Sequence, residues 1–174
     1  MCEINSDDKK QYKIVVVSDT HHDVARLERL LPVINGADRL VFCGDGLSDI
    51  MHIRGCITVP IICVKGNNDF STAVSYLPYA MEDNAVMYHF NRKLFFTHGD
   101  RYNALRVPPI LEVGDALIHG HTHVGHLQKY NGLYVLNVGS LARPRDGVPN
   151  YLILDDVGAT LKQINGETLR QLKW

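Results

Sequence analysis

Five short apolar segments of this chain are each followed by side chains of the kinds that bind metal ions. A parallel or mixed sheet places the carboxyl ends of its strands along one edge, so segments that end in this way bring their polar side chains into one crevice. We therefore expect a metal site built from strand ends, with enough ligands for two ions. The expected ligands are Asp19, His21, Asp45, Asn67, His98, His121 and His123.

The first half of the chain has the pattern of alternating strands and helices. Lys13 to Val17 is a valine-rich run typical of a strand that is buried on both faces. Apolar residues then recur at helical intervals from 24 to 34, with Asp23 placed to cap the helix and Pro32 placed to disturb its end. Two further strands are expected at 39–43 and 60–64, and turns with one helical turn separate them. The first half is thus predicted to be a β-α-β series.

The second half is predicted to consist mainly of strands. Residues 85–90 and 93–97 have the pattern of a hairpin with Asn91-Arg92 as its two-residue connection. Residues 100–114 show little periodicity, which predicts a loop with a short helical piece. Further strands are expected at 116–119, 134–138, 151–154 and 160–164, with turns at Asn131-Gly132 and Gly158. The pattern predicts an α/β fold in which two mixed sheets pack face to face with helices outside.

Length and composition fit one folded body. With 174 residues, 45% of them hydrophobic, we expect a single domain over residues 1–174, with a flexible polar leader over residues 1–12. The net charge of −1 provides no general basic surface, so no obligatory nucleic-acid partner is expected. The sequence lacks a long apolar stretch and a signal peptide, which predicts a cytoplasmic protein with no membrane partner. A homo-oligomer is compatible with these features.

The ligand types indicate which metals the site would bind. Carboxylate, imidazole and amide oxygen donors suit Mn²⁺, Fe²⁺, Co²⁺, Ni²⁺ or Zn²⁺, and the four cysteines form no CxxC pair of a structural zinc site. Taken singly, each residue has an ordinary explanation, since Asp19 or Asp45 can cap a turn and His98 can be a hydrogen-bonded imidazole. Their coincidence at five strand ends favours a functional site.

The ordered blocks SDTH, GDG, GNND, THG and GHTH resemble the motifs of the calcineurin-like metallophosphoesterase superfamily, and in particular its small YfcE-type phosphodiesterases. The resemblance implies a four-layer α/β/β/α sandwich with metals at the strand ends. It implies two divalent ions per chain, with Mn²⁺ preferred and Zn²⁺, Fe²⁺, Co²⁺ or Ni²⁺ as alternatives. One ion would be held by Asp19, His21, Asp45 and His123, and the other by Asp45, Asn67, His98 and His121, with Asp45 as the bridge.

The chain departs from the family pattern at two positions. Asn68 stands where many relatives have a histidine, and an amide cannot act as a general acid toward a departing alkoxide. Val138 stands where many close relatives have proline in an NPGS motif. Asp69 is expected to orient a neighbouring loop or ligand. Arg143 and Arg145 follow a predicted strand end, and either contact with a substrate phosphate or exposure to solvent is open for them.

The ligand set and the resemblance together predict an enzyme. It would be a metal-dependent phosphodiesterase, a hydrolase that cleaves small phosphodiesters by attack of a metal-bridging hydroxide. Nothing in the sequence marks a substrate cap, so a phosphomonoesterase or nucleotide phosphatase with the same centre is the alternative. A protein-interaction scaffold of the same fold is the alternative of another class, and the complete set of ligands argues against it.

Overall fold

The computed structural model describes residues 11–69 and 82–174. Most of the predicted leader, residues 1–10, lies outside the described residues. The last residue of that leader, Tyr12, packs its ring against His89 with the ring centroids 4.0 Å apart, so this part of the leader joins the folded body. None of the helices in the described ranges is long and apolar enough to span a membrane.

The first sheet has six strands and is mixed. In spatial order its strands are β11 (Thr168–Lys173), β10 (Gly158–Gln163), β9 (Asn150–Leu154), β1 (Ile14–Val17), β2 (Arg39–Phe42) and β3 (Ile61–Cys63). Strands β1, β2 and β3 run parallel, whereas β9, β10 and β11 are joined by antiparallel pairing. The three parallel strands therefore end at the same edge, directly before the predicted ligands of the first half.

The second sheet has five strands and is also mixed. In spatial order its strands are β4 (Asn84–His89), β5 (Arg92–Thr97), β6 (Ala116–His119), β8 (Leu133–Asn137) and β7 (His126–Tyr130). The central strands β5, β6 and β8 are parallel, and β4 and β7 pair antiparallel at the two borders. His98 follows β5 directly, and the segment with His121 and His123 follows β6.

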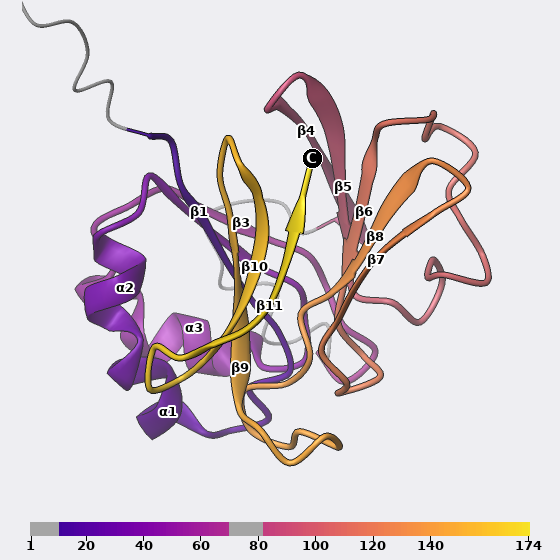
Figure 1. The fold of residues 1–174 in the computed structure, drawn as a ribbon. Coiled ribbons are helices and arrows are strands. Elements are labelled where there is room, and N and C mark those ends of the chain that lie inside the picture. The colour runs from indigo at the N-terminus through magenta and orange to yellow at the C-terminus, as the bar shows by residue number, and fades with distance from the viewer. Residues whose placement is uncertain (1–10, 70–81) are drawn as a thin grey trace, which may run out of the picture.

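Within the described residues, three short helices lie on the outer side of the first sheet, as Figure 1 shows, and a 3₁₀ turn follows the third. They are α1 (Val24–Arg29), α2 (Leu31–Asn35), α3 (Leu47–Ile53) and η1 (Arg54–Cys56). The side chain of Asp23 accepts a hydrogen bond from the Arg26 N–H and caps α1, as predicted. The predicted helix over 24–34 is divided in two, because Pro32 lies in the first turn of α2, where its missing N–H is tolerated.

Strand β1 is the centre of the hydrophobic core. Ile14 and Val16 pack between the two sheets, while Val15 and Val17 pack beneath the helices. The prediction of a strand buried on both faces is therefore confirmed. The α/β class and the two packed mixed sheets are confirmed as well. The helices of the described residues cover the first sheet, and on the second sheet Phe95 packs edge-on against Tyr102 of the loop after β5, with centroids 5.7 Å apart.

Several local predictions need correction. The β4–β5 hairpin turns at Phe90-Asn91 rather than Asn91-Arg92, because these two residues adopt positive φ values of 53° and 56° and Arg92 pairs with His89. The expected helical piece at 100–114 is wrong, since that segment consists of turns and irregular loop. Gly158 begins β10 instead of forming a turn, and strands β7 and β11 were not predicted.

Candidate metal centre

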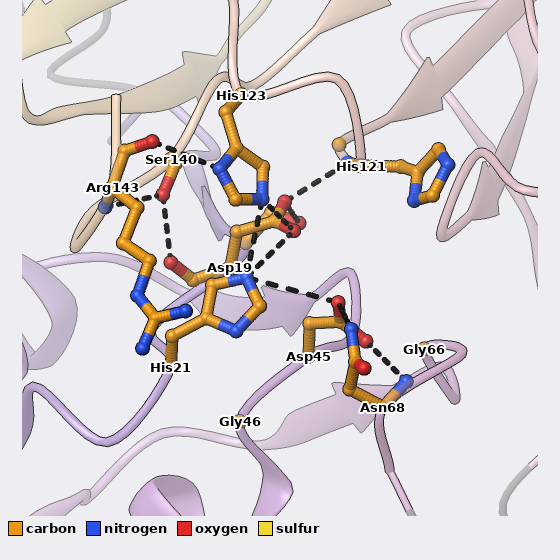
Figure 2. A network of polar contacts seen from close by, with 12 residues as sticks. Asp19, His21, Asp45, Gly46, Gly66, Asn68, His121, His123, Ser140 and Arg143 are labelled. Carbon is orange, nitrogen blue, oxygen red and sulfur yellow. Dashed lines mark hydrogen bonds and ion pairs between the residues drawn. The ribbon is translucent and has the colours of Figure 1, made fainter. Parts of the chain in front are cut away.

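The structure brings the seven predicted ligands together at the carboxyl ends of strands from both sheets. Figure 2 shows Asp19, His21, Asp45 and His123 grouped together, with the ring of His121 directed away from that of His123. The first sheet supplies Asp19, His21, Asp45 and Asn67, and the second sheet supplies His98, His121 and His123. The site therefore exists only where the two sheets are packed together.

Three of these side chains form what we call the first donor set, namely Asp19, His21 and His123. The Nε2 atom of His123 lies 3.1 Å from Asp19 Oδ1 and 3.1 Å from His21 Nε2. His21 Nε2 lies 3.7 Å from Asp19 Oδ1. One atom of each residue thus faces a common point, which is the arrangement that a single cation requires.

Three further side chains form the second donor set, namely Asn67, His98 and His121. The Nε2 atom of His98 lies 3.0 Å from Asn67 Oδ1 and 3.2 Å from His121 Nδ1. Asp45 lies between the two sets, because its Oδ2 atom is 3.5 Å from His98 Nε2 and 3.8 Å from His21 Nε2. One carboxylate oxygen can therefore serve both donor sets.

These donor sets fit divalent metal ions. Asp19 is fully buried, and its Oδ1 atom accepts no hydrogen bond of good geometry from the part of the chain that the structure describes. A buried carboxylate oxygen without a hydrogen-bond donor is costly unless a cation satisfies it. Carboxylate, imidazole and amide oxygen are the donors that divalent transition metals accept. The orphaned oxygen and the donor chemistry thus point to the same occupant.

The backbone around the ligands is not extended. Asp19, His21, Asp45, His121 and His123 have φ values of 55°, 36°, 60°, 67° and 61°. The expectation that each pair of ligands points to one side in extended geometry is therefore wrong, because these residues occupy left-handed turns directly after their strands. Such conformations cost on the order of 1–3 kcal/mol each and persist where the surroundings hold them.

Asp69 holds the turns that carry the ligands of the first sheet. Its Oδ2 atom accepts hydrogen bonds from the N–H groups of Asp45 at 2.8 Å and Gly66 at 2.9 Å. Its Oδ1 atom accepts from the N–H groups of Gly46 at 2.9 Å and Leu47 at 3.0 Å. This buried carboxylate therefore joins the turn after β2 to the turn after β3, in agreement with the orienting role expected for it.

Asp49 holds the turn after β1 by accepting hydrogen bonds from it, and this residue was not identified from the sequence. Its Oδ2 atom accepts from Thr20 Oγ1 at 2.6 Å and from the His22 N–H at 2.9 Å. The signal was present, because Asp49 is an acid within the apolar segment of α3 that buries Leu47 and Ile50. A buried acid in such a segment needs donors nearby, and here they belong to the turn that carries two ligands.

Two glycines are required by close approach to the ligands. A Cβ atom on Gly66 would lie 2.2 Å from Asp45 Oδ1, and one on Gly120 would lie 2.4 Å from Asp19 Oδ2. Ser18 Oγ and the His121 N–H donate to that same Asp19 oxygen, at 2.6 and 2.9 Å. The small residues at the strand ends are thus needed because the backbone passes directly beside both carboxylates.

The charges in the pocket favour a cation. Burial opposes ionisation of Asp19, but contacts with His123 and His21 outweigh it and hold the pKa of Asp19 well below its usual range. Burial opposes protonation of His98, yet its contact with Asp45 and the charge of Asp19 raise the pKa of His98 to about 9. Burial and the neighbouring His98 lower the pKa of His121. The metal-free pocket therefore holds ionised carboxylates and a proton that a metal ion would displace.

The remaining candidates lie at the border of the site. Asn68 touches Asp45, with its side-chain amide 2.5 Å from Asp45 Oδ2. The loop of Arg143 and Arg145 makes two contacts with His123. His123 Nδ1 lies 2.8 Å from the Arg143 carbonyl oxygen, and the His123 carbonyl oxygen accepts a hydrogen bond from the Arg145 N–H at 2.9 Å. Both arginine side chains are exposed, so a contact with substrate stays a prediction.

The calcineurin-like phosphoesterase superfamily domain matches residues 12–158. The chain belongs to this family, as its motifs predicted, and it is a hydrolase of the metal-dependent phosphoesterase class. Phosphodiesterase MJ0936 of Methanocaldococcus jannaschii is 26% identical over 153 residues, which span 82% of this chain and 92% of that protein. Phosphodiesterase YfcE of Escherichia coli is 25% identical over 176 residues, which span 90% and 95%.

Solved structures show the same fold. The E. coli phosphoesterase YfcE matches with a TM-score of 0.84 at 23% identity, covering 92% of this chain and 98% of its own. Wild-type Vps29 of Entamoeba histolytica complexed with Zn²⁺ matches with a TM-score of 0.63 at 21% identity, covering 92% and 98%. The fold is thus shared by proteins whose sequences have diverged widely from this one.

Proposed function

We propose that the protein is a dinuclear metal-dependent phosphodiesterase that hydrolyses small phosphodiesters. The observation that carries this proposal is the position of Asp45 Oδ2 between two donor sets, 3.5 Å from His98 and 3.8 Å from His21. A carboxylate placed in this way is suited to be shared by two cations. The phosphodiesterase names of the relatives support a diester as the substrate. Oxygen and imidazole donors without thiolate are compatible with Mn²⁺, the ion that we propose, and also with Zn²⁺, Fe²⁺, Co²⁺ or Ni²⁺.

The chain's own residues prepare the site for such ions. His98 Nδ1 and His123 Nδ1 each lie 2.8 Å from a backbone carbonyl oxygen, of Cys43 and Arg143 respectively. A ring N–H donated to a carbonyl fixes the tautomer and leaves Nε2 with a lone pair for the metal. A bound pair of divalent ions would supply an activated water near neutral pH and would stabilise negative charge on the phosphoryl group.

The leaving group receives no proton from Asn68. An amide group has no proton that it can release at neutral pH, so a phosphodiester whose alcohol is itself acidic should react fastest. Asn68 instead donates hydrogen bonds to Asp45, from its backbone N–H at 2.8 Å and from its side chain at 2.5 Å. The contacts of Asn68 thus direct its amide toward Asp45 and give no support to acid catalysis.

The space beside the second donor set is polar. A cavity of about 420 Å³ adjoins Asn67, and the side chains of Lys65, Asp83, Asp100 and Arg101 line it. Its size and charged walls favour a small polar substituent on the phosphodiester over a long apolar one. The proposal requires neither a nucleic acid nor a membrane as partner, and a homo-oligomer is compatible with it.

A phosphomonoesterase or nucleotide phosphatase with the same centre is the alternative within this enzyme class, and the open border of the site accommodates it. A protein-interaction scaffold is the alternative of another class, and the similarity in fold to Vps29 is the reason to consider it. The complete set of ligands argues for bound metal, because seven polar side chains gathered without a cation would be costly, and a bound pair of divalent ions is suited to hydrolysis. The ligand set thus favours an enzyme over the scaffold alternative.

The test combines metal content with turnover. After reconstitution with Mn²⁺ we expect two ions per chain, together with hydrolysis of phosphodiesters in a panel that includes monoesters and cyclic nucleotides. Asp45→Asn should lower turnover by at least about 100-fold. Losing a residue that only hydrogen-bonds to a metal ligand already lowers metal affinity or activity by about 10- to 100-fold, and a ligand shared by two ions should matter more. Asp115→Asn, far from the site, is the matched control. A stoichiometry that never exceeds one ion per chain would refute the dinuclear proposal. Turnover of phosphomonoesters alone would refute the proposal that the substrate is a phosphodiester.

A further inference from the structure

One residue, Asn68, donates hydrogen bonds to both oxygens of the Asp45 carboxylate. The backbone N–H of Asn68 donates to Asp45 Oδ1 at 2.8 Å, and the Asn68 side-chain amide donates to Asp45 Oδ2 at 2.5 Å. Figure 2 shows the side chain of Asn68 reaching toward Asp45. Asn68 is itself exposed, so this hydrogen bond and not packing determines where its amide lies.

The oxygen that the amide contacts is the one that faces both donor sets. Asp45 Oδ2 is the atom near His98 Nε2 and His21 Nε2, at 3.5 and 3.8 Å. Each carboxylate oxygen offers about two lone-pair sites. If this oxygen is shared between two cations, both sites are used and the Asn68 amide has no lone pair to bind.

The other oxygen cannot take over the shared position without a larger change. Asp45 Oδ1 is held by a backbone N–H, which is less free to move than a side chain. The Asp45 N–H is in turn held by Asp69 at 2.8 Å, and a Cβ atom on Gly66 would lie 2.2 Å from Oδ1, so the backbone is packed around this side. The exposed side-chain amide of Asn68 is therefore the group that would move away from Asp45 when two cations share Oδ2.

We propose that the side chain of Asn68 is a displaceable lock on Asp45, released when the second metal ion binds. This inference rests on the proposed dinuclear function and goes beyond it. With one ion bound, Oδ2 keeps a lone pair for the amide, and the lock persists. Binding of the second ion breaks the hydrogen bond, so the second ion binds more weakly than it would to a free carboxylate. Asn68 thereby sets the difference in affinity between the two ions.

The expected size of the effect follows from the strength of the contact. A hydrogen bond to a charged group corresponds to about a 10- to 100-fold change in an equilibrium constant. Asn68→Ala should therefore tighten the binding of the second ion by that factor and leave the first ion nearly unchanged. Asn68→Leu, which keeps the size of the side chain but lacks the donor, should have the same effect.

The experiment is a stepwise Mn²⁺ titration of the metal-free protein, with free Mn²⁺ followed by electron paramagnetic resonance. Wild type, Asn68→Ala and Asn68→Leu are compared with Asn165→Ala, in which the replaced asparagine is an exposed residue of the β10–β11 turn that accepts the Glu167 N–H. Circular dichroism and the melting temperature show that each variant is folded. We expect tighter second-ion binding in both Asn68 variants and wild-type behaviour in Asn165→Ala.

The outcomes separate this inference from the function on which it rests. Two ions in wild type, with unchanged or weaker second-ion affinity in both Asn68 variants, would overturn the lock and leave the dinuclear proposal standing. A wild type that never binds a second ion would overturn both. Tightening that appears equally in Asn165→Ala would also overturn the lock, because it would not depend on the contact with Asp45.

Discussion

Replacing Asp69 by Asn tests whether one carboxylate organises the metal centre. Its two oxygens accept four backbone N–H groups, from Asp45, Gly46, Leu47 and Gly66, at 2.8 to 3.0 Å. An asparagine keeps one oxygen and can satisfy two of these donors. Its NH₂ group then faces the other two donors, so two N–H groups in a buried turn lose their acceptor.

The magnitude follows from those two donors. A buried donor without a partner costs about 1–3 kcal/mol, so Asp69→Asn should lower the free energy of unfolding of the metal-free protein by about 2–6 kcal/mol. This is a large share of the roughly 5–15 kcal/mol that stabilises a domain. Because the same N–H groups position Asp45, Mn²⁺ affinity should also fall, by about 10- to 100-fold as for other outer partners of metal ligands.

The assay is urea denaturation with chelator present, followed by Mn²⁺ titration under conditions in which each variant is folded. Asp115→Asn is the matched control, because the Asp115 carboxylate also accepts backbone N–H groups, from Lys93 and Glu112 at 2.9 Å each, but lies away from the ligands. It should lose some stability and keep wild-type Mn²⁺ affinity. The reasoning is refuted if Asp69→Asn unfolds at the wild-type urea midpoint, or if its Mn²⁺ affinity equals that of Asp115→Asn.

Three further predictions concern the same centre. Gly66→Ala should abolish Mn²⁺ loading measured by metal analysis, since its Cβ would lie 2.2 Å from Asp45 Oδ1, and a normally loaded variant would contradict the geometry. The pKa of His98 is raised to about 9 from 6.5, so protonation of His98 stabilises the metal-free fold below pH 6.5, by at most about 3 kcal/mol. This stabilisation is lost as the pH rises through 9. Denaturation with chelator present, measured between pH 6.5 and 9, should show the decline in stability. Aryl phosphodiesters should be cleaved much faster than alkyl ones, because Asn68 cannot protonate the leaving oxygen; a flat dependence of rate on leaving-group pKa would identify another proton donor.

The sequence was sufficient to place the strands that carry the ligands. The runs before Asp19, Asp45 and His98 are apolar and short, and small or polar residues end each of them abruptly. Such runs are buried strands in this fold, and the topology of a mixed sheet then brings their ends together. The predicted convergence of ligands therefore followed from strand ends alone, although their individual roles stay predictions.

Other features depend on contacts that a sequence pattern does not carry. Strands β7 and β11 have half-exposed, polar sequences, HLQKY and TLRQLK, and they become strands because β8 and β10 offer free edges for pairing. The left-handed backbone at His121 and His123 also depends on tertiary structure, since the Asp19 carboxylate accepts the His121 N–H across 102 positions of sequence. Asp49 is a different case, because its place as an acid within the apolar segment of α3 was a signal that the sequence carries.

The division of each donor set between the two sheets has a consequence for how the protein is made. During synthesis the chain up to residue 67 emerges with Asp19, His21, Asp45 and Asn67, but without any ligand from the second sheet. The second set is not complete until residue 121 has left the ribosome, and the first set not until residue 123, while the first sheet still awaits β9 to β11 at that stage. Domains generally fold as units during synthesis. Metal loading is therefore expected to be a late event in biogenesis, and a truncated nascent chain would sequester little metal.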